Sequence, residues 1–354
     1  MTPPVDARAV QPNRAFGLLA IDADCLFYGG VRKWGSRATA QAMCVLGLVA
    51  SLAVPLWTPA PPPPARAEAS SSSRSEDLGT WPSTEEIVGA DSADIQPPVN
   101  IDAASAYAAS VAAAGRGMAG VAVLDRRTGS YVDNGVGGHT AMGSASVIKV
   151  LMAEEILHRA AVGQVLLAPT DYTRIEAMLV DSNDPAASSL YTQFGGVTLI
   201  VAALTRHHLT ESAAPADPQY WGNTKITAYD VVKFYDSVLD GSLPATSRDY
   251  LFGLLRRPAP IASDGFGQLF GLAGRDPTLN AAVKQGWMCC LDGVRNVHST
   301  AVLGEHNRYV VVILTQYPPS LPWEHGLTTT TEIARLVLDG LPADRELPRS
   351  WHHG

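Results

Sequence analysis

The sequence predicts an α+β fold in which one antiparallel sheet is completed from both ends of the domain. Strand-like runs occur early, at Gly120 to Leu124, and again late, at Val283 to Cys290, and the stretch between them is mainly helical. Strands distributed in this way form one sheet beside a helical region. With a helix before the first strand and another after the last, we expect a three-layer, αβα-like arrangement.

The elements follow in a definite order. An alanine-rich stretch favours a first helix, and two short β-type runs around a turn indicate a hairpin. The predicted helices are Ala103–Ala114, Ser146–Ala161, Pro185–Gln193, Ala228–Leu239, Arg248–Arg256 and the amphipathic Leu327–Leu338. The predicted strands are Gly120–Leu124, Ser130–Asn134, Val283–Cys290, Val297–Leu303 and Tyr309–Tyr317.

Length and composition fit a globular domain with disordered additions. The chain has 354 residues, enough for one large domain or two small ones, and 46% of them are hydrophobic. The net charge of −8 gives no electrostatic basis for nucleic-acid binding, which needs clustered Lys and Arg.

An apolar segment near the N-terminus predicts contact with a membrane. Residues 38–57 carry no charge, and Arg32, Lys33 and Arg37 precede them. About 20 apolar residues can span a bilayer, and the basic flank keeps the N-terminal side in the cytoplasm. Ala65-Arg66-Ala67 suits signal peptidase, so the segment is either a retained signal anchor or a cleaved signal peptide.

The domain boundaries follow from these features. We expect a cytoplasmic extension over 1–37, the membrane segment over 38–57 and a disordered Pro/Ser/acidic linker over 58–99. A folded domain then covers 100–343, and a flexible tail covers 344–354. The chain would be exported, remaining in the cell membrane with its folded domain outside or being secreted after cleavage.

The four cysteines form no disulfide framework. Cys25 and Cys44 lie before or inside the apolar segment, which leaves the adjacent Cys289 and Cys290 in the body of the chain. This pair is either a vicinal disulfide or two small buried strand residues.

No cofactor or metal motif is present. His207-His208 and His352-His353 lack the spacing of a zinc site and are better explained by a polar surface and a ragged C-terminus. Trp221, Trp287 and Tyr220 either line a site or pack in the core or at its rim. We therefore predict no cofactor.

The most informative motif is Ser146-Val147-Ile148-Lys149. Positions i and i+3 share one face of a helix, so Lys149 can reach the Ser146 hydroxyl. A partly desolvated lysine can act as the base for a serine nucleophile. The helix around this pair is apolar on nearly every side, which is typical of a domain interior.

Two further motifs follow in order, Ser182-Asn183-Asp184 at a turn and Lys284-Gln285-Gly286 on a strand. Over roughly Val99 to Gly340 the chain resembles the class A β-lactamase and penicillin-binding protein superfamily, whose signatures are S-x-x-K, S-D-N and K-T-G. The resemblance implies the β-lactamase/transpeptidase-like fold. It also implies a β-lactam or a peptidoglycan-type peptide as substrate.

The resemblance assigns a role to each matching position. Ser146 would be acylated, Lys149 would be its base or proton relay, and Ser182 would pass a proton to the leaving nitrogen. The backbone N–H groups of Ser146 and Met288 would form the oxyanion hole, which stabilises the charge that develops during attack.

On the substrate side, the resemblance makes Lys284 and Gly286 markers of the strand that edges the site. Lys284 would attract a substrate carboxylate. Asp184 would stand where an amide normally contacts the substrate's acylamido group.

The chain departs from the family pattern at three places. Asp and Asn are exchanged in the second motif; a one-residue shift restores Asn183 but puts Asp181 at the proton-shuttle position. Gln285 replaces a threonine or serine that could hold the substrate carboxylate. The loop Leu209–Thr227 lacks the E-x-x-L-N pattern whose glutamate activates the deacylating water; its carboxylates Glu211 and Asp217 are expected to be solvated loop residues.

Two functions remain in competition. The first is a serine hydrolase or acyltransferase that forms an acyl-serine. Its acyl-enzyme would be hydrolysed slowly if no other base replaces the missing glutamate. The second is a degenerate cell-wall-binding module that keeps the fold without turnover. A lipase-type triad is not supported, because no serine lies in a G-x-S-x-G elbow.

Overall fold

The computed structural model describes residues 98–273 and 277–342. The predictions for 1–37, for the membrane segment 38–57, for nearly all of the linker 58–99 and for the tail 344–354 lie outside the described residues, as do Cys25, Cys44, His352 and His353.

Five antiparallel strands form the central sheet, in the order β2-β1-β7-β6-β5. Their bounds are β1 Met118–Asp125, β2 Ser130–Asp133, β5 Ala282–Cys289, β6 Arg295–Leu303 and β7 Tyr309–Tyr317. Strand β1 pairs with the last strand, β7, along its whole length, with Val121 opposite Ile313. The sheet is therefore completed from both ends of the domain, which confirms the predicted fold class.

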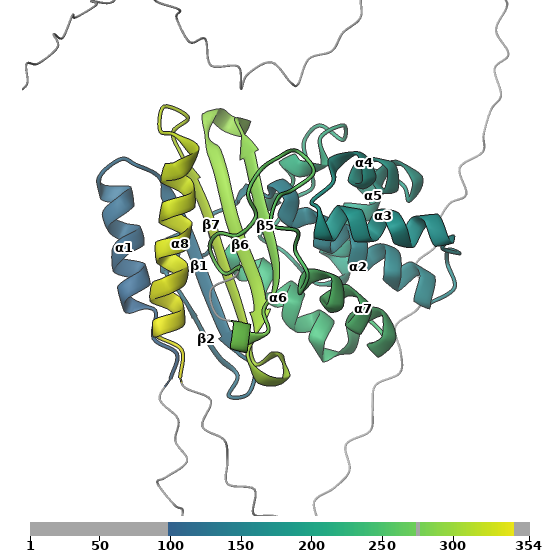
Figure 1. The fold of residues 1–354 in the computed structure, drawn as a ribbon, viewed down its shortest axis with the longest axis horizontal. Helices are drawn as coiled ribbons and strands as arrows, with labels where there is room; N and C mark the ends of the chain where they lie inside the picture. The colour runs from purple at the N-terminus through teal and green to yellow at the C-terminus, as the bar shows by residue number, and fades with distance from the viewer. Residues whose placement is uncertain (1–97, 274–276, 343–354) are drawn as a thin grey trace, which may run out of the picture. The chain divides into compact units, whose positions relative to one another are not determined.

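Two helices cover one face of this sheet. Helix α1 (Asp102–Ala113) and helix α8 (Trp323–Asp339) lie side by side over it (Figure 1). Buried residues of the helices, such as Ala104 and Ile333, share a hydrophobic cluster with Val121 and Val311 of the strands. These positions alternate along each strand with residues that face the opposite side.

The other face meets the helical region, which forms the right half of Figure 1. Its helices are α2 Ile148–Ala161, α3 Pro169–Val180, α4 Asp184–Gln193, α5 Val197–Arg206, α6 Ala228–Ser237 and α7 Ala245–Leu255, with a π-helical turn at Val238–Ser242. A small second sheet pairs β3 (Met142–Gly143) with β4 (Lys225–Ile226).

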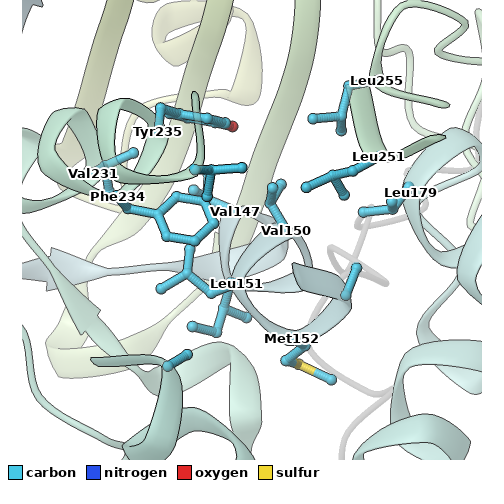
Figure 2. Close-up of a cluster of buried hydrophobic side chains, with 14 of the residues drawn as sticks. Val147, Val150, Leu151, Met152, Leu179, Val231, Phe234, Tyr235, Leu251 and Leu255 are labelled. Carbon is cyan, nitrogen blue, oxygen red and sulfur yellow. The ribbon is translucent and has the colours of Figure 1, made fainter. Parts of the chain in front are cut away.

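Helix α2 runs through the core of the helical region. Figure 2 shows Val150 and Leu151 of α2 among side chains from α3, α6 and α7, including Leu179, Phe234 and Leu251. Because every residue of α2 from Ile148 to Leu157 is buried, packing fixes the position and rotation of the helix. The S-x-x-K motif spans the short turn before α2 and the first two residues of the helix, so it is fixed with the helix.

The structure corrects the predicted elements at several points, and strands β3 and β4 were not predicted. The helix predicted to begin at Ser146 starts as a short 3₁₀ turn, Ala145–Val147, and continues as α2. Helices α3 and α5 were not among the predicted elements. Helix α3 has Pro169 at its first position, and the Asp171 carboxylate accepts a hydrogen bond from the Ala168 N–H, both signals of a helix start.

Within the described ranges, no single helix is both long and apolar enough to cross a membrane. Helices α4 and α5 meet that test only as a pair, and the pair is bent by 83°.

Candidate active site

The turn that carries Ser146 is held by the small second sheet. Directly after β3, the Ser144 N–H donates to the Thr224 carbonyl at 2.7 Å, and the Ser144 hydroxyl donates to the Gly222 carbonyl at 3.1 Å. Ala145 follows with a φ of 47°, in the left-handed region that alanine rarely adopts. Such a conformation persists only where surrounding contacts impose it, and it is frequent at functional sites.

A buried histidine supports the same turn from the central sheet. The Nε2 of His298 on β6 donates to the Gly143 carbonyl at 2.7 Å, and its Nδ1 accepts from the Thr315 N–H at 3.1 Å. Complete burial lowers the pKa of His298 to about 4, so the imidazole is neutral at physiological pH. No sequence motif identifies this residue, because 155 positions separate it from Gly143.

Lys149 lies fully buried one turn after Ser146. Its Nζ donates to the Ser182 carbonyl at 2.5 Å, to the Asp184 carboxylate at 2.6 Å and to the Ser182 hydroxyl at 3.3 Å. Within the described residues, Lys149 forms no hydrogen bond with the Ser146 hydroxyl. Burial lowers the pKa of Lys149, and the charge of Asp184 opposes that shift.

Ser182 links the two motif lysines. Its hydroxyl accepts hydrogen bonds from Lys149 at 3.3 Å and from Lys284 at 3.0 Å, and its φ is 51°. Lys284 is also buried, and its Nζ donates to the Gln285 carbonyl. Burial, together with the positive charge of Lys149, holds the pKa of Lys284 well below its usual range. The structure thus brings together three of the motif side chains that lie far apart in sequence.

The exchanged Asn and Asp of the second motif have separate tasks. The Asn183 side chain caps helix α4 by accepting from the Ala186 N–H at 2.7 Å. Asp184, the next residue, pairs with Lys149 through a side chain that is 47% exposed. This arrangement supports the unshifted alignment, with Ser182 and not Asp181 beside the lysines.

Strand β5 presents alternate residues to the site. Lys284, Gly286 and Met288 lie on the side that faces the helical region, and β5 is the edge strand of the sheet. A Cβ atom on Gly286 would lie 3.1 Å from the Ser144 carbonyl oxygen and 3.1 Å from Val147 Cγ2. Glycine therefore allows the edge strand to approach the turn that carries Ser146.

Gln285 does not face the site. Its side-chain amide donates to the Phe270 carbonyl at 2.6 Å and to the Gln268 carbonyl at 3.2 Å, and its oxygen accepts from the Ser299 hydroxyl at 3.0 Å. The residue that replaces the family's hydroxyl thus fixes the segment around 268–270 against β5.

That segment also brings a carboxylate towards the lysines. Asp264 accepts a hydrogen bond from the Trp287 indole at 2.9 Å, and the Trp287 ring centre lies 5.9 Å from Lys284 Nζ. The charge of Asp264 raises the pKa of both Lys149 and Lys284 in opposition to their burial. Asp264 was not among the predicted site residues, because it belongs to none of the three motifs.

The carboxylates of the loop Leu209–Thr227 accept hydrogen bonds from groups other than Lys149. Glu211 accepts from His139 Nδ1 at 2.9 Å, and this bond raises the pKa of His139. Asp217 accepts from the Gln219 N–H at 2.9 Å. Asp217 is exposed, as expected for a solvated loop residue, whereas Glu211 is half-buried.

The loop instead contacts Lys149 through an aromatic ring. The Trp221 ring centre lies 5.1 Å from Lys149 Nζ, and its indole N–H donates to the Ser188 hydroxyl at 3.1 Å. The sequence left Trp221 open as a site or packing residue, and the structure places it against the motif lysine. Tyr220, its neighbour, is exposed.

The prediction that His207 lies on a polar surface is wrong. His207 is buried, and it contacts Glu154 at 3.0 Å and Ser237 at 2.9 Å. In the part of the chain that the structure describes, no group of three or more His, Cys, Asp or Glu side chains could hold a metal ion.

Cys289 and Cys290 form a disulfide, and both residues are exposed. Of the two alternatives left open by the sequence, the pair of buried strand residues is therefore wrong. The disulfide lies at the end of β5, directly after Met288.

Comparison of the sequence finds mycobacterial relatives over part of the chain. No protein-family model matches the chain. The chain is 38% identical over 200 residues to a Mycobacterium tuberculosis protein named "Putative lipoprotein LppW", and equally to its Mycobacterium bovis counterpart. The match covers 56% of this chain and 63% of each relative, so the chain spans less than two thirds of their length.

Comparison of the structure identifies the fold. An ancestral class A β-lactamase matches with a TM-score of 0.54, 20% identity, and coverage of 67% of this chain and all of that one. An acyl-enzyme complex of a PBP-A mutant with penicillin G gives a TM-score of 0.55, 18% identity, and coverage of 69% and 98%. The extended-spectrum β-lactamase TLA-3 matches with a TM-score of 0.56 and 13% identity, and the match covers 68% of this chain and 98% of that one. The chain therefore has the β-lactamase/transpeptidase-like fold, as its three motifs predicted.

Proposed function

We propose that this chain is an exported serine acyl-transfer enzyme that forms an acyl-serine at Ser146 with β-lactams or peptidoglycan-type peptides. The observation that carries the proposal is the position of the Ser182 hydroxyl, which accepts hydrogen bonds from both Lys149 and Lys284. One hydroxyl between two buried amines is suited to pass protons, because burial lowers the pKa of both amines and so makes each easier to deprotonate than an exposed lysine.

In this mechanism Lys149 accepts the Ser146 proton as the Ser146 oxygen attacks the substrate carbonyl carbon. Ser182 then delivers a proton to the leaving nitrogen, and Lys149 replaces it. The N–H groups of Ser146 and Met288 stabilise the oxyanion. Because Lys284 is buried behind Ser182, its charge acts on a substrate carboxylate mainly through the Ser182 hydroxyl.

Export is supported by the name of the mycobacterial relatives, which describes a lipoprotein, and by the apolar sequence of 38–57. In our proposal the enzyme works in the cell envelope, attached through that segment or secreted after cleavage.

Covalent labelling with a fluorescent penicillin tests the proposal. We expect a labelled band in the natural protein and none in Ser146→Ala, whereas Ser110→Ala, an exposed serine of α1, should label normally. Labelling of Ser146→Ala equal to that of the natural protein would refute the assignment of the nucleophile.

The competing function is a cell-wall-binding module without turnover. The pairing of Lys149 with Asp184 in place of Ser146 favours it, because a lysine held in an ion pair is a weaker base. This function predicts no label in any variant, together with a higher melting temperature of Ser146→Ala when peptidoglycan fragments are added.

A further inference from the structure

Trp221 covers the motif lysine from the side of the loop Leu209–Thr227. Its ring centre is 5.1 Å from Lys149 Nζ, and its N–H is bonded to Ser188 on helix α4. Helix α4 begins at the second motif, so the ring connects that motif with the S-x-x-K helix. The face of an indole ring attracts a cation and excludes water from the space it fills.

The backbone beside Trp221 is fixed to the turn of the nucleophile. The Ser144 N–H and hydroxyl donate to the carbonyls of Thr224 and Gly222, and the Thr224 hydroxyl donates to the Trp221 carbonyl at 2.8 Å. A Cβ atom on Gly222 would lie 4.0 Å from Ala145 Cα, the residue before Ser146. Several hydrogen bonds therefore fix the position of the Trp221 backbone relative to the turn that carries Ser146.

What the loop presents to Lys149 is therefore aromatic and not acidic. Among the described residues of the loop, Glu211 is bonded to His139 and Asp217 to the Gln219 N–H. Hydrolysis of an acyl-serine needs a water molecule at the ester carbonyl carbon and a group that takes a proton from it. An indole ring supplies no such group and restricts the space for water.

We propose that Trp221 is a positioning residue that keeps Lys149 and the acyl-serine dry and so sets the lifetime of the acyl-enzyme. The inference rests on the proposed function. In the step that Trp221 slows, the water oxygen bonds to the carbonyl carbon and the bond from that carbon to Ser146 Oγ breaks. One water proton returns to Ser146 Oγ, and the other stays with the released acid.

Removal of the ring also changes the charge state of Lys149. The groups that act on Lys149 are Asp184 on α4, Asp264 on its loop and Lys284 on β5. Burial is the largest cause of the lowered pKa, so admitting water raises the pKa of Lys149 towards its ordinary value. Loss of the cation–π contact acts in the opposite direction, but hydration of an ammonium group outweighs it.

The test uses the full chain and penicillin G, with intact-mass spectrometry to follow formation and loss of the adduct. We compare Trp221→Ala and Trp221→Phe with Tyr250→Ala, which removes an aromatic ring of helix α7 that packs on Tyr172 of helix α3. In Trp221→Ala we expect the adduct to be lost roughly tenfold faster and the acid limb of the acylation pH profile to move to higher pH. Trp221→Phe keeps an aromatic ring, so its rate of adduct loss and its pH profile should stay near those of the natural protein.

Each outcome separates the two proposals. An adduct that forms in Trp221→Ala but persists as long as in the natural protein, with an unmoved pH profile and a cooperative melting transition, would overturn the role of Trp221. The same loss of lifetime in Tyr250→Ala would also overturn it, because the effect would then be general destabilisation. If the natural protein forms no adduct, the proposed function itself has failed.

Discussion

The Nζ of Lys149 lies 2.6 Å from the carboxylate of Asp184, the residue at which the second motif departs from the family pattern. Asn183 takes the cap of helix α4, so exchange of the two residues leaves an acid, not an amide, beside the lysine. This ion pair favours the protonated form of Lys149, whereas burial favours the neutral form that can act as a base.

Asp184→Asn should therefore make Lys149 a better base. Without the carboxylate, the pKa of Lys149 falls further, and we expect the acid limb of the acylation pH profile to move down by about one pH unit or more. Acylation at neutral pH should become faster. Stopped-flow labelling across pH measures the shift, with Glu211→Gln as the control that leaves the profile unchanged; a limb that moves upward in Asp184→Asn contradicts the account.

Gly286→Ala should slow acylation by displacing the turn of the nucleophile. The new Cβ would lie 3.1 Å from the Ser144 carbonyl oxygen, so either β5 or the turn must move. A displacement near 1 Å at a reacting group can cost roughly a hundredfold in rate. The labelling rate at fixed penicillin concentration measures this.

The matched control is Gly253→Ala on helix α7, where an added Cβ meets no atom within 4 Å. Helix propensity predicts that this variant is more stable by about 0.5–1 kcal/mol and labels at the natural rate. Equal labelling rates in both variants would show that Gly286 is not needed for close approach.

Gln285→Thr restores the third motif of the β-lactamase pattern, but it should lower the free energy of unfolding. The amide makes hydrogen bonds to Gln268, Phe270 and Ser299, and threonine is too short to replace them. Loss of buried partners costs about 1–3 kcal/mol. Urea unfolding measures the change, with the exposed Gln219→Thr as control; a Gln285→Thr protein of unchanged stability would contradict the described role.

His298 should make the protein less stable in acid. Its pKa is about 4 when folded and 6.5 in the unfolded chain, so its stabilising contribution is complete above pH 6.5 and is lost as the pH falls towards 4. The difference corresponds to about 3 kcal/mol, as an order of magnitude. His298→Gln, whose amide can still donate to the Gly143 carbonyl, should show a smaller loss of unfolding free energy between pH 7 and pH 4.5. A loss as large in His298→Gln as in the natural protein would assign the acid sensitivity to other groups.

The sequence predicted the parts of this molecule that local patterns encode. Strand β7 was predicted with its observed bounds, Tyr309–Tyr317, since a continuous β-branched run is buried on both faces. Helix α5 was not predicted, because its run of Val, Ile and Thr has weak helix propensity and packing against α2 stabilises it.

For the site, motif order was sufficient to bring Ser182 together with Lys149 and Lys284. It was not sufficient to show which partner each lysine takes, because that depends on contacts between segments far apart in the chain. The support of Gly143 by His298, and the turning of Gln285 away from the site, have no local sequence signal. They depend on strand register and on which face of the sheet each residue occupies.

Intact-mass spectrometry of the full chain mixed with penicillin G tests the central claim most directly. The account predicts a stable mass increase of one ligand that maps to the peptide containing Ser146 and is lost slowly after free penicillin is removed. Protein that remains unmodified, with penicillin left intact both at neutral pH and at pH 9, would contradict the claim that Ser146 is an activated nucleophile.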